Sequence, residues 1–134
     1  EKVQVMIIRC GGEAAVECDW VDAENFDAPK LVADGGTPLG DAVSLAAEQL
    51  EQRKVDFRSA GVNYFKPWVF IISDGEPNDE NWERKAQEFK EGEGDGKYTT
   101  FTVGVEDADL GCLNEFSQRY AIMLNGIEFT KLFM

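Results

Sequence analysis

The chain has 134 residues and carries 26 acidic against 13 basic side chains, which gives a formal net charge of −13. This length allows one domain with a hydrophobic core, and the acidic surface repels phosphate backbones and anionic lipid, so nucleic acid and membranes are not expected partners. Histidine is absent from the sequence, which excludes Ser-His-Asp and Cys-His nucleophile systems as well as histidine zinc sites.

The cysteines and the apolar runs indicate the compartment. Cys10, Cys18 and Cys112 form no CxxC pair, and an odd number of cysteines favours free thiols in a reducing environment. The longest apolar run, Trp68 to Ile72, is much shorter than a membrane span, and the first residues lack the features of a signal peptide. We therefore expect a soluble cytoplasmic protein.

The N-terminal part of the chain predicts a β-hairpin. Val3 to Arg9 is apolar on both faces of a strand, and Gly11-Gly12 follows it with the residues that the positive φ angles of a tight turn favour. Ala14 to Val21 then alternates apolar with acidic residues. This alternation indicates a second strand with one face in solvent, at the edge of a sheet.

A long helix is expected after the hairpin. Thr37 is a favourable N-cap, and Pro38 suits the first helical position, where its missing N–H costs nothing. Apolar residues then recur at helical spacing: Leu39, Val43, Ala46 and Leu50. The helix should run into the region of residues 53–58, and Gly61 should end the connection that follows it.

Two further apolar runs predict strands of a parallel sheet. Pro67 to Ser73 is expected to be buried on both faces, and Tyr98 to Val105 is a second buried strand. Between them an amphipathic helix and a glycine-rich turn over residues 91–97 are expected, the helix marked by Trp82, Ala86 and Phe89. The rest of the chain predicts a helix with Leu110, Leu113 and Phe116, a strand from Ala121 to Leu124, and a terminal helix with Phe129, Leu132 and Phe133.

Strands that alternate with helices predict a doubly wound α/β fold, with a mostly parallel sheet and an antiparallel edge hairpin. Ligands of such sheets bind beyond the carboxyl ends of the strands. Asp74 follows the most buried predicted strand, and Gly75 allows a sharp turn into an acidic loop. The Asp74 carboxylate can hold a hard divalent cation, or it can bond to its own backbone in a turn. The hydroxyl of Thr37 likewise suits either a cation or a helix cap.

Two motifs resemble the von Willebrand factor A (VWA) domain. The first is the run Asp34-Gly35-Gly36-Thr37-Pro38-Leu39-Gly40-Asp41-Ala42, and the second is the run from Pro67 to Pro77 with Ser73-Asp74-Gly75-Glu76-Pro77 at its end. Both are most similar to the tellurium-resistance (TerY-like) branch, which residues 101–105 and 124–129 also fit. The resemblance covers nearly the whole chain and implies one VWA-type domain over residues 1–134.

The resemblance implies a metal site. The metal-ion-dependent adhesion site (MIDAS) of this family combines a DxSxS motif after the first strand, a threonine at the start of a later helix and an aspartate after the fourth strand. Thr37 matches the threonine and Asp74 matches the aspartate. The resemblance therefore implies Mg²⁺ at Thr37 and Asp74, with Mn²⁺ or Ca²⁺ as alternatives, and a protein partner that offers a carboxylate to the ion.

The DxSxS motif occurs nowhere in the sequence, and no strand precedes Val3 to carry it. The predicted hairpin resembles the second and third strands of the family, so its central first strand and the helix after it are expected to be missing from this chain. Two open sheet edges would leave unpaired backbone groups, each of which costs roughly 1–3 kcal/mol when buried. We expect a separate N-terminal piece or a swapped copy to complete the fold.

Three functions fit these residues. The first is a non-enzymatic, Mg²⁺-linked protein-binding module, which the family resemblance would place in an intracellular tellurium- or stress-resistance system. The second is a Mg²⁺-dependent phosphotransferase with Asp74 as its nucleophile, although no lysine is expected at the end of a neighbouring strand. The third is an interaction domain without metal, in which Thr37 is only a cap and Asp74 only begins a turn.

Overall fold

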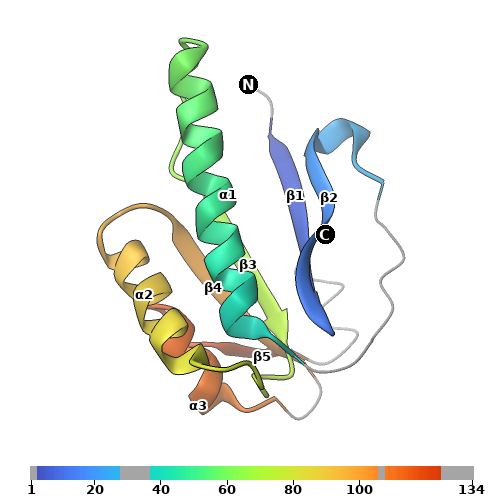
Figure 1. Cartoon of the computed structure of the whole chain (residues 1–134), viewed down its shortest axis with the longest axis vertical. Helices are drawn as coiled ribbons and strands as arrows, with labels where there is room; N and C mark the ends of the chain where they lie inside the picture. Colours follow the sequence, from blue (N-terminus) through green and yellow to red (C-terminus); the bar gives the residue numbers. More distant parts are fainter. Residues whose placement is uncertain (1–2, 28–36, 106–107, 125–134) are drawn as a thin grey trace.

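The computed structural model describes residues 3–27, 37–105 and 108–124. Its elements in chain order are β1 (Gln4–Gly11), β2 (Glu13–Asp22), η1 (Ala23–Asn25), α1 (Leu39–Ser59), β3 (Trp68–Ser73), α2 (Trp82–Gly94), β4 (Thr99–Val105), α3 (Leu110–Leu113), η2 (Asn114–Phe116) and β5 (Ile122–Leu124) (Figure 1). The predicted order of strands and helices is confirmed over these residues. The predicted terminal helix and the run Asp34-Gly35-Gly36 lie outside the described residues.

The hairpin forms as predicted. β1 pairs with β2 in antiparallel register, with Gly11 opposite Glu13 and irregular spacing on either side of Ile7. Gly12 has a φ angle of 70°, a conformation that glycine adopts without steric cost. These irregularities bend and twist the hairpin, as β-bulges do.

The three other strands form a parallel sheet with the order β3-β4-β5. Trp68 lies opposite Thr99, and Val103 of the central strand lies opposite Ile122 of β5. The fold class is therefore α/β with a parallel sheet and an antiparallel hairpin, as predicted. Within the described residues the two sheets are separate, because no ladder joins β1 to β3.

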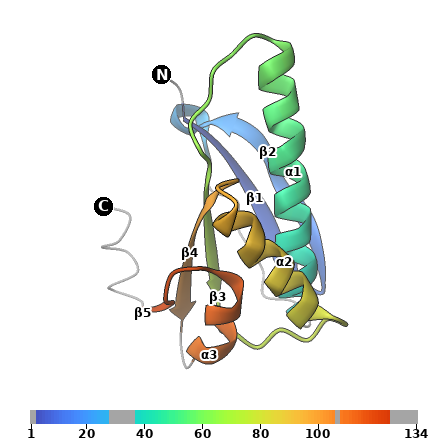
Figure 2. The same ribbon diagram turned by 90° about the vertical axis from the view of Figure 1, so that its left-hand side faces the viewer.

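The hydrophobic core lies between the helices and one face of the parallel sheet. Both views show α1 and α2 on the same side of β3 and β4 (Figures 1 and 2). The buried residues of this core are Leu39, Val43, Leu50, Ile71, Ala86, Phe89, Tyr98, Leu113 and Phe116. α1 also contacts both strands of the hairpin, and Arg53 Nε donates to Gln4 Oε1 at 3.1 Å. α1 is thus the element that connects the hairpin to the rest of the fold.

The prediction that β3 is buried on both faces is wrong for the described residues. Ile71 and Ser73 face the core, whereas the side chains of Trp68 and Ile72 are 67% and 45% exposed. That face is open because α1 and α2 both lie on the other side of the sheet. One edge of β3 is open as well, and the ladder shows which groups lie there: Thr99 N–H donates to Pro67 C=O at 2.9 Å. In a parallel ladder that bond directs the N–H and C=O groups of Trp68 and Ile72 away from β4. On that side β3 has no neighbouring strand among the described residues.

Two helix boundaries also differ from the prediction. α1 begins at Leu39 with Pro38 in the cap position, and no side chain in that position caps the helix. α2 continues to Gly94 through part of the predicted glycine-rich turn. Gly92 lies within this helix because α2 packs closely on Tyr98. A Cβ atom at position 92 would lie 2.3 Å from the hydroxyl of Tyr98, so this packing requires glycine.

Candidate metal-binding site

Asp74 lies where the sequence placed it, directly after the carboxyl end of β3. Its backbone C=O accepts a hydrogen bond from Asp109 N–H at 3.0 Å, which ties it to the segment after β4. Its Oδ1 accepts from Glu76 N–H at 3.2 Å, so the predicted turn bond is present. Gly75 has a φ angle of 77°, and a Cβ atom there would lie 2.6 Å from Asp109 O. Glycine at this position is therefore needed for the turn and for the close approach.

Thr37 is joined to the loop after Asp74 through its backbone. Thr37 N–H donates to Asn78 Oδ1 at 2.9 Å, and Asn78 N–H donates to Thr37 C=O at 3.0 Å. Both backbone polar groups of Thr37 are thus held by one residue that follows Asp74 by four positions. The structure brings the two predicted ligands onto one edge of the molecule, on two segments that are hydrogen-bonded to each other.

The cap of α1 comes from the same loop. Asp79 accepts Gly40 N–H on Oδ1 at 3.2 Å and Asp41 N–H on Oδ2 at 2.8 Å. Its side chain is 6% exposed. Lys85 on α2 forms an ion pair with Asp41, and its Nζ lies 3.9 Å from Asp79 Oδ2. The role that local rules assigned to Thr37 is therefore filled by a carboxylate that follows it by 42 positions in the sequence.

The carboxylates at this edge act on a thiol of the hairpin. Burial, and secondarily the charges of Asp79, Asp41 and Asp74, together raise the pKa of Cys10 to about 12. The end of β1 therefore lies in the negative potential of these three residues. A divalent cation bound in this region would reduce that potential, as a bound metal ion does for the groups around it.

The donor atoms suit a hard cation but do not complete its coordination. A threonine hydroxyl and an aspartate carboxylate are oxygen ligands of the kind that Mg²⁺ binds, and Mg²⁺ needs about six donors including its waters. The described residues contain no group of three or more histidine, cysteine, aspartate or glutamate side chains that could hold a metal ion. Thr37 and Asp74 supply two oxygen donors, so water and further oxygen atoms would have to complete the coordination.

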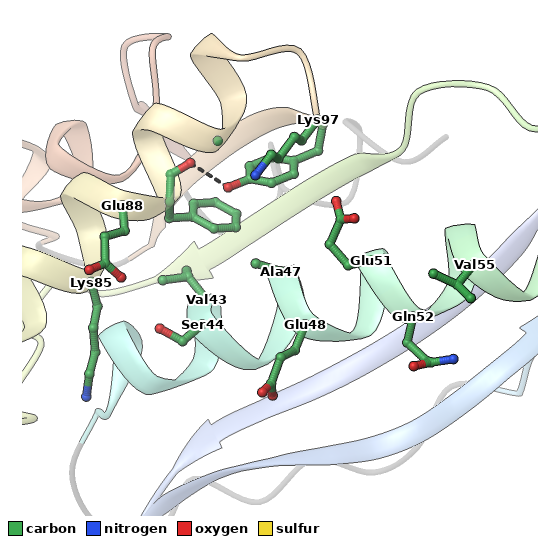
Figure 3. Close-up of a pocket in the computed structure, with 13 residues that line it drawn as sticks. Val43, Ser44, Ala47, Glu48, Glu51, Gln52, Val55, Lys85, Glu88 and Lys97 are labelled. Carbon is green, nitrogen blue, oxygen red and sulfur yellow. Dashed lines mark hydrogen bonds between the residues drawn. The ribbon is translucent and has the colours of Figure 1, made fainter.

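A separate groove lies between α1 and α2, with a volume of about 470 Å³ (Figure 3). Its walls include Glu48 and Glu51 on α1 and Glu88 on α2, and neither Thr37 nor Asp74 lines it. Tyr98, another lining residue, donates its hydroxyl to Phe89 C=O at 2.6 Å. Burial and, secondarily, Glu93 raise the pKa of Tyr98, so this phenol remains protonated near neutral pH and cannot serve as a base. The groove is thus not part of the candidate metal site.

Sequence reasoning missed four residues around the site. Asn78, Asp79, Asp41 and Lys85 hold the edge together, but each acts on a residue that is distant in the sequence. Only the proximity of Asn78 and Asp79 to Asp74 in the chain indicated that they share a loop. Which backbone groups they bond follows from the tertiary structure alone.

The fold is an α/β domain with a parallel sheet and an antiparallel hairpin, and polar side chains follow the carboxyl end of β3. The sequence model of the von Willebrand factor type A domain matches residues 1–129, and the chain belongs to this family. A search of curated proteins finds no match. VWA domains commonly mediate protein interactions, and many bind a divalent metal ion. In the part of the chain that the structure describes, no helix is long and apolar enough to cross a membrane.

Proposed function

We propose that this VWA domain is a non-enzymatic binding module that recognises a protein partner through a divalent cation, Mg²⁺ in the first instance, held by Thr37 and Asp74. The observation that supports this most directly is the pair of bonds between Thr37 and Asn78, which joins the two oxygen donors through one short loop. The ion would supply a positive charge at an acidic edge. A carboxylate of the partner would complete its coordination.

The test is calorimetric titration of Mg²⁺ into the protein as purified, with Asp74→Ala and a neighbouring control. Asp74→Ala should abolish binding. Glu76→Ala removes the same charge from the same loop, but Glu76 is exposed and is not a proposed ligand, so this variant should retain binding. Thr37→Val should weaken binding and Thr37→Ser should preserve it, since serine keeps the hydroxyl. Equal binding by wild type and Asp74→Ala would rule out the proposed site.

The partner proposal includes completion of the sheet. A separate N-terminal piece, or a swapped copy of the domain, adds one strand between β1 and β3. The separate sheets support this, as do the N–H and C=O groups of Trp68 and Ile72, which point away from β4. Apolar side chains on the added strand would pack beside the exposed Trp68 and Ile72.

This completion has its own test. Ile72→Pro removes an N–H that does not serve the β3–β4 ladder, so the isolated chain should fold and should lose the added strand. Ile71→Pro removes an N–H on the β4 side and should disrupt the parallel sheet itself. Native mass spectrometry of both variants beside the wild type detects an added peptide or a dimer. A wild-type monomer with no added mass contradicts the completion but leaves the metal proposal standing.

The proposal includes a cellular setting, which the motifs support. The similarity of Gly35–Pro38 and Asp74–Pro77 to the tellurium-resistance branch supports a role in a cytoplasmic resistance system. Binding is favoured over phosphoryl transfer because Lys85, the lysine that contacts carboxylates of this edge, pairs with Asp41 and lies 3.9 Å from Asp79, and the structure gives it no bond to Asp74. Phosphoryl labelling that is lost in Asp74→Ala would instead establish the enzyme. If the domain instead acts without metal, it should bind its partner equally well with and without a chelator.

A further inference from the structure

The loop from Asp74 to Asp79 makes contacts that the proposed ligands alone do not explain. Five positions separate these two aspartates, and between them the chain leaves β3, turns at Gly75 and reaches the start of α1. Asn78 holds the backbone of Thr37, and Asp79 holds the first helical N–H groups. Two consecutive loop residues, Asn78 and Asp79, therefore connect the loop that carries Asp74 to the segment that carries Thr37.

Asp79 is suited to positioning rather than to ligation. Each of its oxygens already accepts one backbone N–H, from Gly40 and Asp41, and its side chain is 6% exposed. A carboxylate at a helix N-terminus is stabilised by the unpaired N–H groups and by the helix dipole. Lys85 balances the charge of Asp79 and Asp41 from the side of α2. The carboxylate is thus buried, bonded and neutralised without a metal ion.

The close packing of this loop against α1 depends on a second residue. A Cβ atom on Gly40 would lie 2.6 Å from Asp79 Oδ2 and 2.9 Å from Trp82 Cα. Any side chain at position 40 would therefore push the loop away from the helix. Glycine in the first turn of a helix lowers helix propensity, so the residue is explained by the close approach rather than by the helix itself.

We propose that Asp79 is the positioning residue of the cation site: by capping α1 across the fold, it holds Thr37 and Asp74 in the relation that a single ion requires. The inference rests on the proposed function, because it concerns the same ion. Residues that orient metal ligands without touching the metal change its affinity by about 10- to 100-fold when they are replaced. Asp79 should therefore matter for Mg²⁺ binding although it does not contact the ion.

The experiment compares Asp79→Asn with Glu80→Gln in the protein as purified. Both variants remove one negative charge from adjacent positions, but the structure gives the Glu80 side chain no bond among the described residues. Two quantities are measured: the Mg²⁺ dissociation constant, and the amide exchange rates of Gly40 and Asp41 without metal. Asp79→Asn should weaken Mg²⁺ binding about tenfold and speed exchange at both amides, whereas Glu80→Gln should change neither by more than about twofold.

Gly40→Ala provides an independent variant that leaves the carboxylate in place. It should displace the loop and weaken Mg²⁺ binding in the same direction as Asp79→Asn. Faster exchange in Asp79→Asn with unchanged Mg²⁺ affinity would overturn the inference and make Asp79 a cap only. Weaker affinity with unchanged exchange would overturn it in favour of direct ligation. Failure of the proposed function has a different signature, because wild type itself would then show no binding that depends on Asp74.

Discussion

The two faces of β3 differ strongly in how far the described residues cover them. Ile71 is 6% exposed and packs in the core beneath α1 and α2, whereas the next residue, Ile72, is 45% exposed on the opposite face. Trp68, on the same face as Ile72, is 67% exposed. Figure 2 shows both long helices on one side of the sheet. An apolar strand of this kind is built for cover on both sides, and the described residues provide it on one.

This difference shows which part of the fold carries its stability. The covered face has a nearly continuous core from Leu39 to Phe116, so changes there act on many neighbours. The open face has an aromatic cluster in which the Phe70 and Phe101 rings stack at 5.2 Å and Trp68 meets Phe101 edge-on at 5.6 Å. Such a surface is typical of an interface, because large exposed apolar patches on soluble proteins mark binding sites.

The largest expected contrast is between Ile71→Ala and Ile72→Ala. The two changes remove the same atoms from adjacent positions, so only the surroundings differ. Ile71→Ala should lower the free energy of unfolding by about 2–4 kcal/mol through lost burial and a cavity, and Ile72→Ala by less than about 1 kcal/mol. Urea denaturation of both variants beside the wild type measures the contrast. Equal losses would mean that the face of Ile72 is covered in solution.

A smaller effect is expected from a polar group within the covered face. Tyr98 stacks on Phe89 with ring centroids 4.5 Å apart and donates its hydroxyl to the Phe89 carbonyl. Tyr98→Phe keeps the stacking and removes the bond, so it should cost about 1 kcal/mol at neutral pH. Denaturation at pH 7 measures it. The carboxylate of Glu93 accepts a hydrogen bond from Thr100 N–H nearby, and this bond should be unchanged in the variant.

The pH dependence of this bond has a definite sign. Burial raises the pKa of Tyr98 above its usual value, so the folded state binds the phenolic proton more tightly than the unfolded state. Stability from this group is therefore complete below the unfolded pKa of about 10 and falls as the pH rises above it. As the pH rises above about 10, wild type should lose stability more steeply than Tyr98→Phe. Parallel slopes for the two proteins would contradict the burial of the phenol.

Much of the fold could be predicted because its signals are local. The hairpin follows from Gly11-Gly12 between two apolar strands, and α1 follows from apolar residues at helical spacing. The exposure of one face of β3 could not be predicted, because an apolar run does not show which elements lie against it. The length of α2 was underestimated because Gly92 suggests a turn, although its role is to admit Tyr98.

The candidate site divides in the same way. Asp74 and Thr37 were indicated by their places after a strand and before a helix, and the structure joins their segments through Asn78. The cap of α1 was assigned to Thr37 by a local rule, and Asp79 fills it instead. Local preference is a weak guide where a distant carboxylate can reach the same N–H groups. The metal ligation itself stays a prediction.

The smallest effect, and the one that tests the comparison most sharply, is expected from Trp68→Ala. Trp68 is 67% exposed and has mainly its edge-on contacts with Phe70 and Phe101 to lose, so the change should cost about 0.5–1 kcal/mol. Lys66→Ala, two residues earlier and also exposed, is the matched control. The measurement is urea denaturation at two protein concentrations tenfold apart. A loss above about 2 kcal/mol that grows with concentration would mean that a second copy covers this face, since binding stabilises the folded state by mass action. A loss above about 2 kcal/mol that is equal at both concentrations would place the cover within the chain itself, and the two faces of β3 would then be alike.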